Sequence, residues 1–233
     1  MIGKINSFET LGLNDGPGIR VVIFLQGCPL RCIFCHNPET WQSNSDISQT
    51  PEETLEFIKK YKNYFGDDGG VTFSGGEPLM QPDYLLETLK LCKENNIHTC
   101  LDTSGIYTKN VYEILEYVDL VILDIKSIDN NGYMGITNHN INKFLEFLDI
   151  CRKLNKKLWL RQVIVPGIND NIEHIHKLKE FIKDINYEKI ELLPYHTMAL
   201  SKYEKLNIPY KLKGVKAMDK IKCEELEKIL KSN

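Results

Sequence analysis

The sequence predicts an α/β protein in which six parallel strands alternate with helices to form an incomplete (β/α)6 barrel. Short apolar, β-branched runs alternate with amphipathic stretches along most of the chain. These apolar runs are nearly continuous, as in a parallel sheet that helices cover. Polar residues follow where successive runs end, which is where α/β folds place their sites. We expect a single domain over residues 1–233.

The strand candidates follow one another at regular intervals. They are RVVIFLQG from Arg20, GGVTFSGG from Gly69, HTCLDTSG from His98, LVILDIK from Leu120, KLWLRQVIVPG from Lys157 and KIELLPYH from Lys189. Six such units predict a relative of the eight-unit barrel that lacks two repeats. An open, doubly wound sheet is the competing topology, because the strand pattern alone does not separate the two.

Amphipathic stretches separate these strands. The helix candidates are Pro51–Phe65, Pro82–Asn95, Asn110–Tyr117, Asn140–Leu154 and Asn171–Ile185. A further stretch, KAMDKIKCEELEKILK, has helical spacing and alternating charge, which predicts a solvated amphipathic helix that covers one end of the barrel.

Composition indicates an ordinary globular protein. The chain has 233 residues, of which 42% are hydrophobic and 26% charged, enough to bury a core. Its net charge of −3 comes from 29 basic and 32 acidic side chains that are scattered, which disfavours a nucleic-acid or polybasic membrane partner. The chain lacks a signal-peptide core and any apolar run long enough to span a bilayer, so we expect a cytoplasmic protein. We take a monomer as the default oligomeric state.

Three of the seven cysteines lie in one short loop. Cys28, Cys32 and Cys35 are spaced by three residues and then two, within the stretch QGCPLRCIFCHNPETW. Disulfides are rare in the cytoplasm, so the cluster predicts a metal centre. The other cysteines are isolated in helix-like or strand-like sequence and are expected to be buried as small hydrophobic residues: Cys92, Cys100, Cys151 and Cys223.

The number three distinguishes two kinds of metal centre. A structural zinc site needs a fourth ligand, and His36 is adjacent to Cys35, where simultaneous ligation is awkward. A four-iron cluster held by three cysteines has one iron free, which leaves a coordination position for a substrate. A non-enzymatic zinc-binding module remains the alternative at this point.

Polar groups follow the remaining strands at their carboxyl ends. Each has an ordinary structural explanation, such as a tight turn for two glycines, a helix cap for an aspartate, solvation for a lysine or a hydrogen-bonded loop for a histidine. Together, beside the cysteine loop, they predict a site on one rim. They are Ser74-Gly75-Gly76-Glu77, Asp102-Thr103-Ser104-Gly105, Asp124 with Lys126, Arg161, and Tyr195-His196.

These motifs resemble a known family. CPLRCIFC fits the three-cysteine pattern of the radical S-adenosylmethionine (SAM) superfamily, and SGGEPLMQ is similar to its glycine-glycine-glutamate motif. The likeness extends over nearly the whole chain through four further stretches, SFETLGLNDGPGIR, WLRQVIVPG, KIELLPYH and YKLKGVKAM. These stretches narrow the resemblance to the activating enzymes of glycyl-radical enzymes, in particular those that act on pyruvate formate-lyase. No cysteine lies between Cys35 and Cys92, so a second cluster inserted there is not expected.

The resemblance implies a role for each candidate residue. Cys28, Cys32 and Cys35 would hold a [4Fe-4S] cluster whose open iron binds SAM. Phe34 and His36 would lie near the adenine and His196 at the adenosyl end, while Gly75, Gly76 and Glu77 would bind the methionine amino group. The ribose, the carboxylate or a bound monovalent cation would be contacted by Asp102, Thr103, Asp124, Ile125 and Lys126. Arg161 would serve the carboxylate or the substrate peptide. Lys126 is also implied in catalysis, and Ile122 would offer a cation only its carbonyl.

The resemblance also implies the reaction and its partners. A flavodoxin or ferredoxin reduces the cluster, SAM is cleaved to methionine and a 5′-deoxyadenosyl radical, and this radical removes a hydrogen atom from a glycine Cα of pyruvate formate-lyase. Asp15, just before the first strand, would contact the partner's glycine loop, although a role in a turn is equally compatible. Two alternatives remain: activation of a different glycyl-radical enzyme, and a radical SAM enzyme with a small-molecule substrate.

Overall fold

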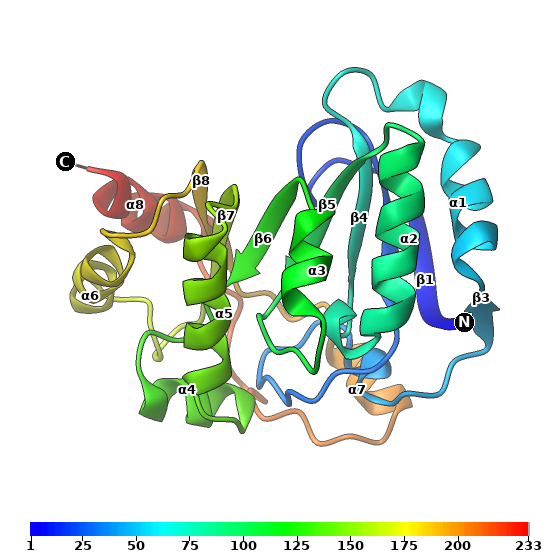
Figure 1. The fold of residues 1–233 in the computed structure, drawn as a ribbon. Helices are drawn as coiled ribbons and strands as arrows, with labels where there is room; N and C mark the ends of the chain where they lie inside the picture. Colours follow the sequence, from blue (N-terminus) through cyan, green and yellow to red (C-terminus); the bar gives the residue numbers. More distant parts are fainter. Residues whose placement is uncertain (233) are drawn as a thin grey trace.

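Six parallel strands form the centre of the fold, side by side in the order in which they occur in the chain (Figure 1). This computed structural model describes residues 1–232. A doubly wound sheet would reverse its strand order at a switch point. The sequential order and the unclosed sheet therefore match the incomplete barrel that the sequence predicts. The strands are β2 (Arg20–Leu25), β4 (Gly70–Gly75), β5 (His98–Thr103), β6 (Leu120–Asp124), β7 (Leu158–Ile164) and β8 (Lys189–Pro194).

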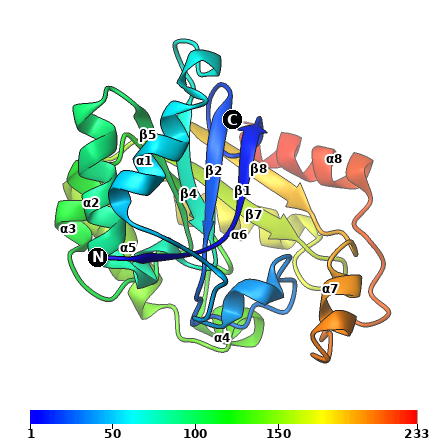
Figure 2. The same ribbon diagram turned by 90° about the vertical axis from the view of Figure 1, so that its right-hand side faces the viewer.

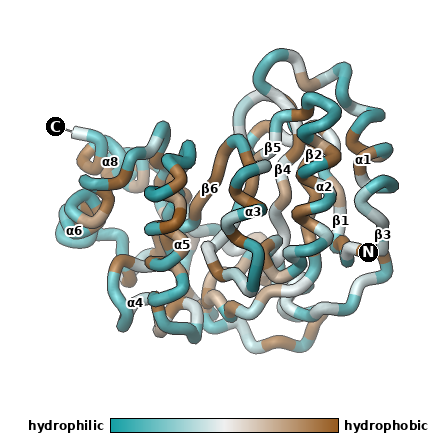
Figure 3. Tube along the Cα trace, viewed as in Figure 1, coloured by the Kyte–Doolittle hydropathy of each residue, from teal (hydrophilic) through white to brown (hydrophobic). Residues whose placement is uncertain are grey.

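Helices connect the parallel strands and cover the outer face of the curved sheet (Figures 1 and 2). Figure 3 shows hydrophobic residues along the central strands and hydrophilic residues on the outer sides of the helices. The helices are α1 (Pro51–Lys59), α2 (Pro82–Glu94), α3 (Val111–Glu116), α4 (Asn130–Thr137), α5 (Asn142–Lys153), α6 (Ile172–Ile182), α7 (Leu200–Lys205) and α8 (Lys220–Lys231). Within residues 1–232, no helix has the length and apolar character needed to cross a bilayer.

Two antiparallel strands extend one edge of the sheet, and the strand predictions did not include them. β1 (Gly3–Gly12) pairs with β2, and β3 (Ile47–Gln49) pairs with β1. β1 alternates between buried and more exposed residues, as an antiparallel strand with one solvated face does. This edge places the N-terminal segment beside the loop that carries the cysteines, where Gln26 N donates to Lys4 O at 2.9 Å.

Local signals set where helices begin and end. Thr50 and Glu53 form a reciprocal capping box at the start of α1. The predicted helix Pro51–Phe65 is shorter than expected, because α1 ends at Lys59 and a separate 3-10 turn follows at Lys62–Tyr64. Asparagines in the left-handed region follow several helices, where this residue is better tolerated than most: Asn96, Asn138, Asn155 and Asn207.

Strand register places polar side chains in one row inside the barrel. Arg161 on β7 lies level with Asp124 on β6 and with Glu191 on β8. Ser74 at the end of β4 donates to Asp102 on β5, with an Oγ–Oδ2 distance of 2.6 Å. The carboxyl ends of all these strands meet on one rim, so the row lies on the inner face at the open end of the barrel.

Apolar residues close the opposite end of the barrel interior. Cys100, Leu120 and Ile122 pack together there, with Trp159 against them. Each of the first three is at most 2% exposed. On the side of β5 and β6, the interior below the polar row is therefore filled by apolar side chains.

Candidate functional site

The loop after β2 carries the three clustered cysteines and is held in place by its own backbone and by α4. Cys35 N donates to Cys32 O at 3.0 Å, which makes a tight turn between two of the cysteines. Arg31 N and Ile33 N donate to Thr137 O and Ile136 O at the end of α4, at 2.9 and 3.0 Å. α4, which was not predicted from sequence, therefore fixes the loop.

The three thiols line a single cavity of about 210 Å³ at the rim of the barrel. Leu30 and Ile106 pack against Cys32 and make its surroundings apolar. Burial raises the pKa of the Cys32 thiol to about 12, and burial also raises the pKa of Cys28 and of Cys35. The predicted residues that share this cavity are Cys28, Cys32, Phe34, Cys35, His36, Gly75, Gly76, Asp102, Thr103, Asp124 and Lys126.

The Gly75-Gly76 turn lies directly against the loop of the cysteines. A Cβ on Gly75 would stand 2.3 Å from Leu25 N, and a Cβ on Gly76 would stand 2.3 Å from Gly27 O. Gly75 also has a φ of +114°, which side chains disfavour. Gly76 N donates to Leu25 O at 2.8 Å. The glycines are therefore required by close packing within the chain.

Glu77 is fully buried, and its carboxylate accepts hydrogen bonds from neighbouring residues of the chain. Thr103 Oγ1 and Leu79 N donate to Oε1 at 2.6 and 3.2 Å, and Ser104 N and Oγ donate to Oε2 at 2.8 and 2.6 Å. Burial raises the pKa of Glu77, and these donors oppose that rise. Glu77 does not line the cavity, so its carboxylate orders the turn after β5 beneath it.

Asp102, Asp124 and Lys126 form a charged group on the cavity wall. Lys126 Nζ donates to Asp124 Oδ2 at 2.6 Å and lies 5.7 Å from the centre of the Phe34 ring. Burial opposes the charge on Lys126, but Asp124 and then Cys32 outweigh it and raise its pKa. Burial and then the nearby Asp124 raise the pKa of Asp102 to about 7. The group combines one cation with two carboxylates.

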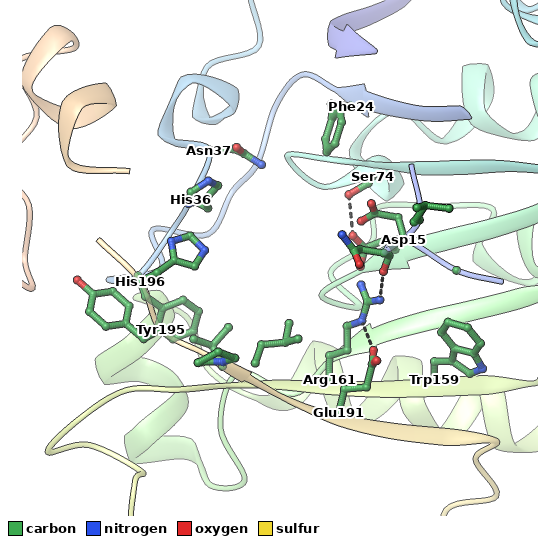
Figure 4. A pocket seen from close by; sticks show the side chains of 18 of the residues that line it. Asp15, Phe24, His36, Asn37, Ser74, Trp159, Arg161, Glu191, Tyr195 and His196 are labelled. Atoms are coloured by element: carbon green, nitrogen blue, oxygen red, sulfur yellow. Dashed lines mark hydrogen bonds and ion pairs between the residues drawn. The ribbon is translucent and has the colours of Figure 1, made fainter. Parts of the chain in front are cut away.

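A larger cavity of about 630 Å³ continues from the first (Figure 4). The two share residues such as Phe34, Ser74 and Asp102. In the larger cavity, Arg161 Nε donates to Glu191 Oε2 at 3.0 Å, and its other end donates to the backbone carbonyl of Asn14. Arg161 thus points from β7 toward the segment that carries Asp15.

Asp15, Arg161 and His196 all line the larger cavity. The sequence predicted a common rim for Arg161 and His196, whereas Asp15 was expected before the first strand. Burial raises the pKa of Asp15, and Arg161 opposes this rise. His36 and His196 face each other edge to face at the other end, with ring centres 4.5 Å apart (Figure 4). The two histidines therefore connect the cysteine loop with the end of β8.

Ile125 is the other predicted residue that lines neither cavity. Its side chain is 1% exposed, and its N donates to Arg161 O at 2.7 Å within the sheet. Its backbone position sets the spacing between Asp124 and Lys126. Sequence reasoning placed Ser74 and Tyr195 on the rim without a specific role, and it did not name the lining residues Asn37, Trp41 and Glu191. Their position at strand ends or just after the third cysteine was the available signal.

Comparison with known proteins places this site in a family. The model of the radical SAM superfamily matches residues 22–182. The chain is 52% identical over 233 residues to the pyruvate formate-lyase-activating enzyme of Clostridium pasteurianum, covering 99% of this chain and 98% of that one. It is 41% identical over 238 residues to the pyruvate formate-lyase 1-activating enzyme of Escherichia coli strain K12, covering 99% and 96%. The chain belongs to the pyruvate formate-lyase-activating enzyme family of the radical SAM superfamily.

Solved structures agree with this family assignment. A domain of the pyruvate-formate lyase-activating enzyme from Bacteroides vulgatus superposes with a TM-score of 0.57 at 25% identity, covering 70% of this chain and 92% of that one. A radical SAM methyltransferase from Sphaerobacter thermophilus gives a TM-score of 0.65 at 13% identity, over 91% and 63%, which supports the fold alone. Membership of the pyruvate formate-lyase-activating enzyme family implies a [4Fe-4S] cluster and SAM as cofactors.

The donor set at the cysteine loop fits a cluster better than a single metal ion. Three sulfur donors meet in one cavity, whereas in residues 1–232 no group of three or more Cys, His, Asp or Glu side chains is arranged to hold one ion. Around a tetrahedral zinc ion with Zn–S bonds of about 2.3 Å, the ligand atoms must crowd together. A larger iron–sulfur group with an open position suits three thiols spaced around a cavity.

Tyr133 on α4 has a buried hydroxyl with no hydrogen-bond partner within residues 1–232, although it lines neither cavity. Burial raises the pKa of this hydroxyl, so it stays protonated, and Lys126 and Cys32 are among the charged groups that act on it. A buried donor left unpaired costs free energy.

We expect Glu77→Ala to destabilise the fold by about 3 kcal/mol, because the donors of Thr103 and Ser104 would be buried without an acceptor. Urea unfolding of the protein without cofactors measures this loss. The exposed Glu94 on α2 provides the control, since Glu94→Ala should change the free energy of unfolding by no more than about 0.5 kcal/mol. Equal losses in the two variants would contradict a structural role for Glu77.

The raised pKa of Asp102 predicts a pH-dependent stability. An unfolded aspartate titrates near pH 4, whereas in the fold the pKa is about 7. The folded state therefore holds a proton that the unfolded state releases, so this contribution is complete below about pH 4 and is lost as the pH rises to about 7. Urea unfolding at several pH values should show Asp102→Asn gaining on the wild type by on the order of 2–4 kcal/mol over this range. A difference that is constant with pH would contradict the assignment.

Proposed function

We propose that this chain activates pyruvate formate-lyase by cleaving SAM reductively and generating a glycyl radical in that partner enzyme. One observation carries the proposal: the three thiols and the Gly75-Gly76 turn line a cavity that continues into a larger one, lined by Asp15, Arg161 and His196. The first cavity suits the cluster and the methionine end of SAM, and the second leaves room for the adenosyl end and for a loop of another protein. The family to which the chain belongs supports the same reaction and a glycyl-radical enzyme as the partner.

The residues of the smaller cavity would hold the cofactors. Cys28, Cys32 and Cys35 would bind the [4Fe-4S] cluster. Lys126 offers an ammonium to the carboxylate of SAM, which is a charge-assisted pair. Because Gly76 N is occupied by Leu25 O, the Gly75-Gly76 turn would present carbonyl oxygens to the amino group of SAM.

The remaining predicted contacts follow from where the side chains lie. Phe34 and His36 line both cavities and would flank the adenine. Asp102, Thr103 and Asp124 offer oxygen ligands to the ribose or to a monovalent cation. His196 faces His36 and would meet the adenosyl end.

When bound, the cluster supplies the electron that cleaves SAM to methionine and a 5′-deoxyadenosyl radical. The chain itself positions groups and excludes water, because a primary alkyl radical attacks whatever lies nearest. Cys100, Leu120 and Ile122 fill the interior below the site with apolar side chains. Arg161, braced by Glu191 and the Asn14 carbonyl, fixes the segment of Asp15 at the entrance, where it would meet the glycine loop of the partner.

We infer further that the electron donor is a flavodoxin or ferredoxin and that the chain acts as a monomer in the cytoplasm. All seven cysteines are free, which fits a reducing compartment. Radical transfer to a loop of a large enzyme needs an accessible entrance rather than a second copy of the chain. Size-exclusion chromatography with light scattering tests the monomer, and an apparent mass of twice 27.0 kDa would contradict it.

Electron paramagnetic resonance tests the proposed function. The protein is reconstituted anaerobically with iron and sulfide and is then mixed with SAM, photoreduced deazaflavin and pyruvate formate-lyase. We expect the doublet of a glycyl radical. A variant partner whose radical-bearing glycine is replaced by alanine is the control and should give no doublet.

The other outcomes separate the alternatives. Formation of 5′-deoxyadenosine without a glycyl radical would contradict pyruvate formate-lyase as the partner and favour a different glycyl-radical enzyme or a small-molecule substrate. Formation of neither product by a protein with an intact cluster would overturn the proposed reaction.

A further inference from the structure

A groove of about 610 Å³ lies on the outside of the loop that carries the cysteines. It is formed where the start of β1, the cysteine loop and the segment after the 3-10 turn Pro38–Trp41 come together. We call it the outer groove. Its lining residues are Lys4, Gln26, Gly27, Cys28, Pro29, Arg31, Trp41, Gln42, Ser43, Asn44, Met80 and Gln81.

The outer groove and the thiol cavity are separated by very little protein. Cys28 and Trp41 line both of them, so these two residues form a shared wall. Cys28 is one of the three thiols proposed to hold the cluster. A redox group placed in the outer groove would therefore be next to a cluster ligand.

The outer groove is distinct from the entrance proposed for the partner enzyme. It shares no lining residue with the larger cavity of Asp15, Arg161 and His196. The thiol cavity adjoins both. A protein bound in the outer groove would thus contact the cluster from a separate surface and leave the larger cavity accessible.

Charge in the outer groove is positive, although the chain as a whole carries −3. Lys4 and Arg31 line the groove, and no Asp or Glu is among its lining residues. Arg31 is held rigidly, because it donates to Cys28 O at 2.7 Å and to Leu30 O at 2.8 Å and lies over the Trp41 ring at 5.0 Å. A fixed cation loses little entropy when it pairs with a carboxylate.

We propose that the outer groove is the docking surface of an acidic one-electron carrier protein, and that the electron enters through the wall of Cys28 and Trp41. This inference rests on the proposed function. The carrier is oxidised by one electron and the cluster is reduced by one, and no bond forms or breaks. Carboxylates around the carrier's redox group would pair with Lys4 and Arg31 and orient that group toward Cys28.

Binding measurements with a flavodoxin as the probe test the docking surface directly. Ser43 and Asn44 are exposed on the rim of the outer groove, so Ser43→Glu/Asn44→Glu adds two carboxylates there without removing a cation. We expect the Kd for flavodoxin to rise by about tenfold at low ionic strength and by much less in high salt. The matched control is Lys228→Glu on α8, which is exposed and lowers the net charge by the same amount.

Two outcomes of this binding measurement would overturn the proposal. One is a Kd that is unchanged in the double variant. The other is a Kd that rises equally in the double variant and in Lys228→Glu, since only the total charge would then matter.

A rate measurement distinguishes a failed docking surface from a failed function. With flavodoxin hydroquinone as the reductant, cluster reduction should slow by about tenfold in the double variant, whereas photoreduced deazaflavin should reduce it at the wild-type rate. Glycyl-radical formation by the wild type with deazaflavin reports the proposed function independently. Equal rates with flavodoxin in wild type and double variant would overturn the inference and leave the function intact.

Cross-linking of the wild-type protein keeps the proposal testable if the double variant does not fold. A carbodiimide joins a lysine to a carboxylate that pairs with it. We expect mass spectrometry of the cross-linked complex with flavodoxin to identify Lys4 as a site of linkage. Linkage confined to lysines elsewhere, such as those of α8, would contradict docking in the outer groove.

Discussion

Cys32→Ala is expected to abolish both cluster binding and glycyl-radical formation. Cys32 is the most buried of the three clustered thiols, at 8% exposure, and Leu30 and Ile106 pack around it. Within residues 1–232, no other Cys, His, Asp or Glu side chain is arranged with Cys28 and Cys35 to take the place of Cys32 as a ligand. Iron and sulfide analysis measures the loss of the cluster, and electron paramagnetic resonance measures the loss of the radical.

The matched control is a cysteine of the hydrophobic core. Cys92 on α2 is fully buried among apolar residues, so Cys92→Ala should cost about 1 kcal/mol of stability and leave the iron content unchanged. Full iron content in Cys32→Ala would refute its assignment as a cluster ligand. Loss of iron in both variants would show that the assay reports folding rather than ligation.

Lys126→Met is expected to weaken SAM binding by on the order of 100-fold. The substitution keeps most of the side-chain volume but removes the ammonium that pairs with Asp124 and is proposed to bind the SAM carboxylate. It also leaves the carboxylate of Asp124 beside Asp102 without its cation, which should lower the free energy of unfolding by about 3 kcal/mol. Isothermal titration calorimetry and urea unfolding measure the two effects.

A double variant separates binding from stability. In Lys126→Met/Asp124→Asn the uncompensated charge is gone, so stability should largely return while SAM binding stays weak. Lys153→Met provides the surface control, because Lys153 pairs with Asp149 on an exposed face of α5 and should affect neither quantity. Recovery of SAM affinity in the double variant would contradict a direct role for Lys126.

Residue types and spacing predicted the six parallel strands, and most of the predicted site residues line the two cavities. The spacing of Cys28, Cys32 and Cys35 places all three in one short loop, and this spacing can be read directly from the sequence. Asp102, Asp124 and Arg161 end or lie within successive parallel strands, whose carboxyl ends must meet at one rim. These inferences depend on position along the chain, which sequence states directly.

Other features depend on direction and packing, which sequence does not state. Glu77 stands in a motif expected to bind a ligand, yet its carboxylate turns inward to the donors of Thr103 and Ser104. α4 contains Gly132 and Gly135, which disfavour helix, but the Asp129 cap and burial of apolar residues outweigh this preference. β1 includes adjacent polar residues, Asn6-Ser7 and Glu9-Thr10, and register shifts interrupt its pairing with β2, so its sequence shows no clear period of two.

The Gly75-Gly76 turn has a mechanical consequence. Gly76 N and Glu77 N donate to Leu25 O and Gly27 O, and Glu77 in turn holds the turn after β5. The cysteine loop and the two neighbouring turns are thereby bound into one stiff block. A substitution elsewhere in the barrel should therefore leave the relative positions of the three thiols unchanged, because three segments far apart in the sequence share one hydrogen-bonded support.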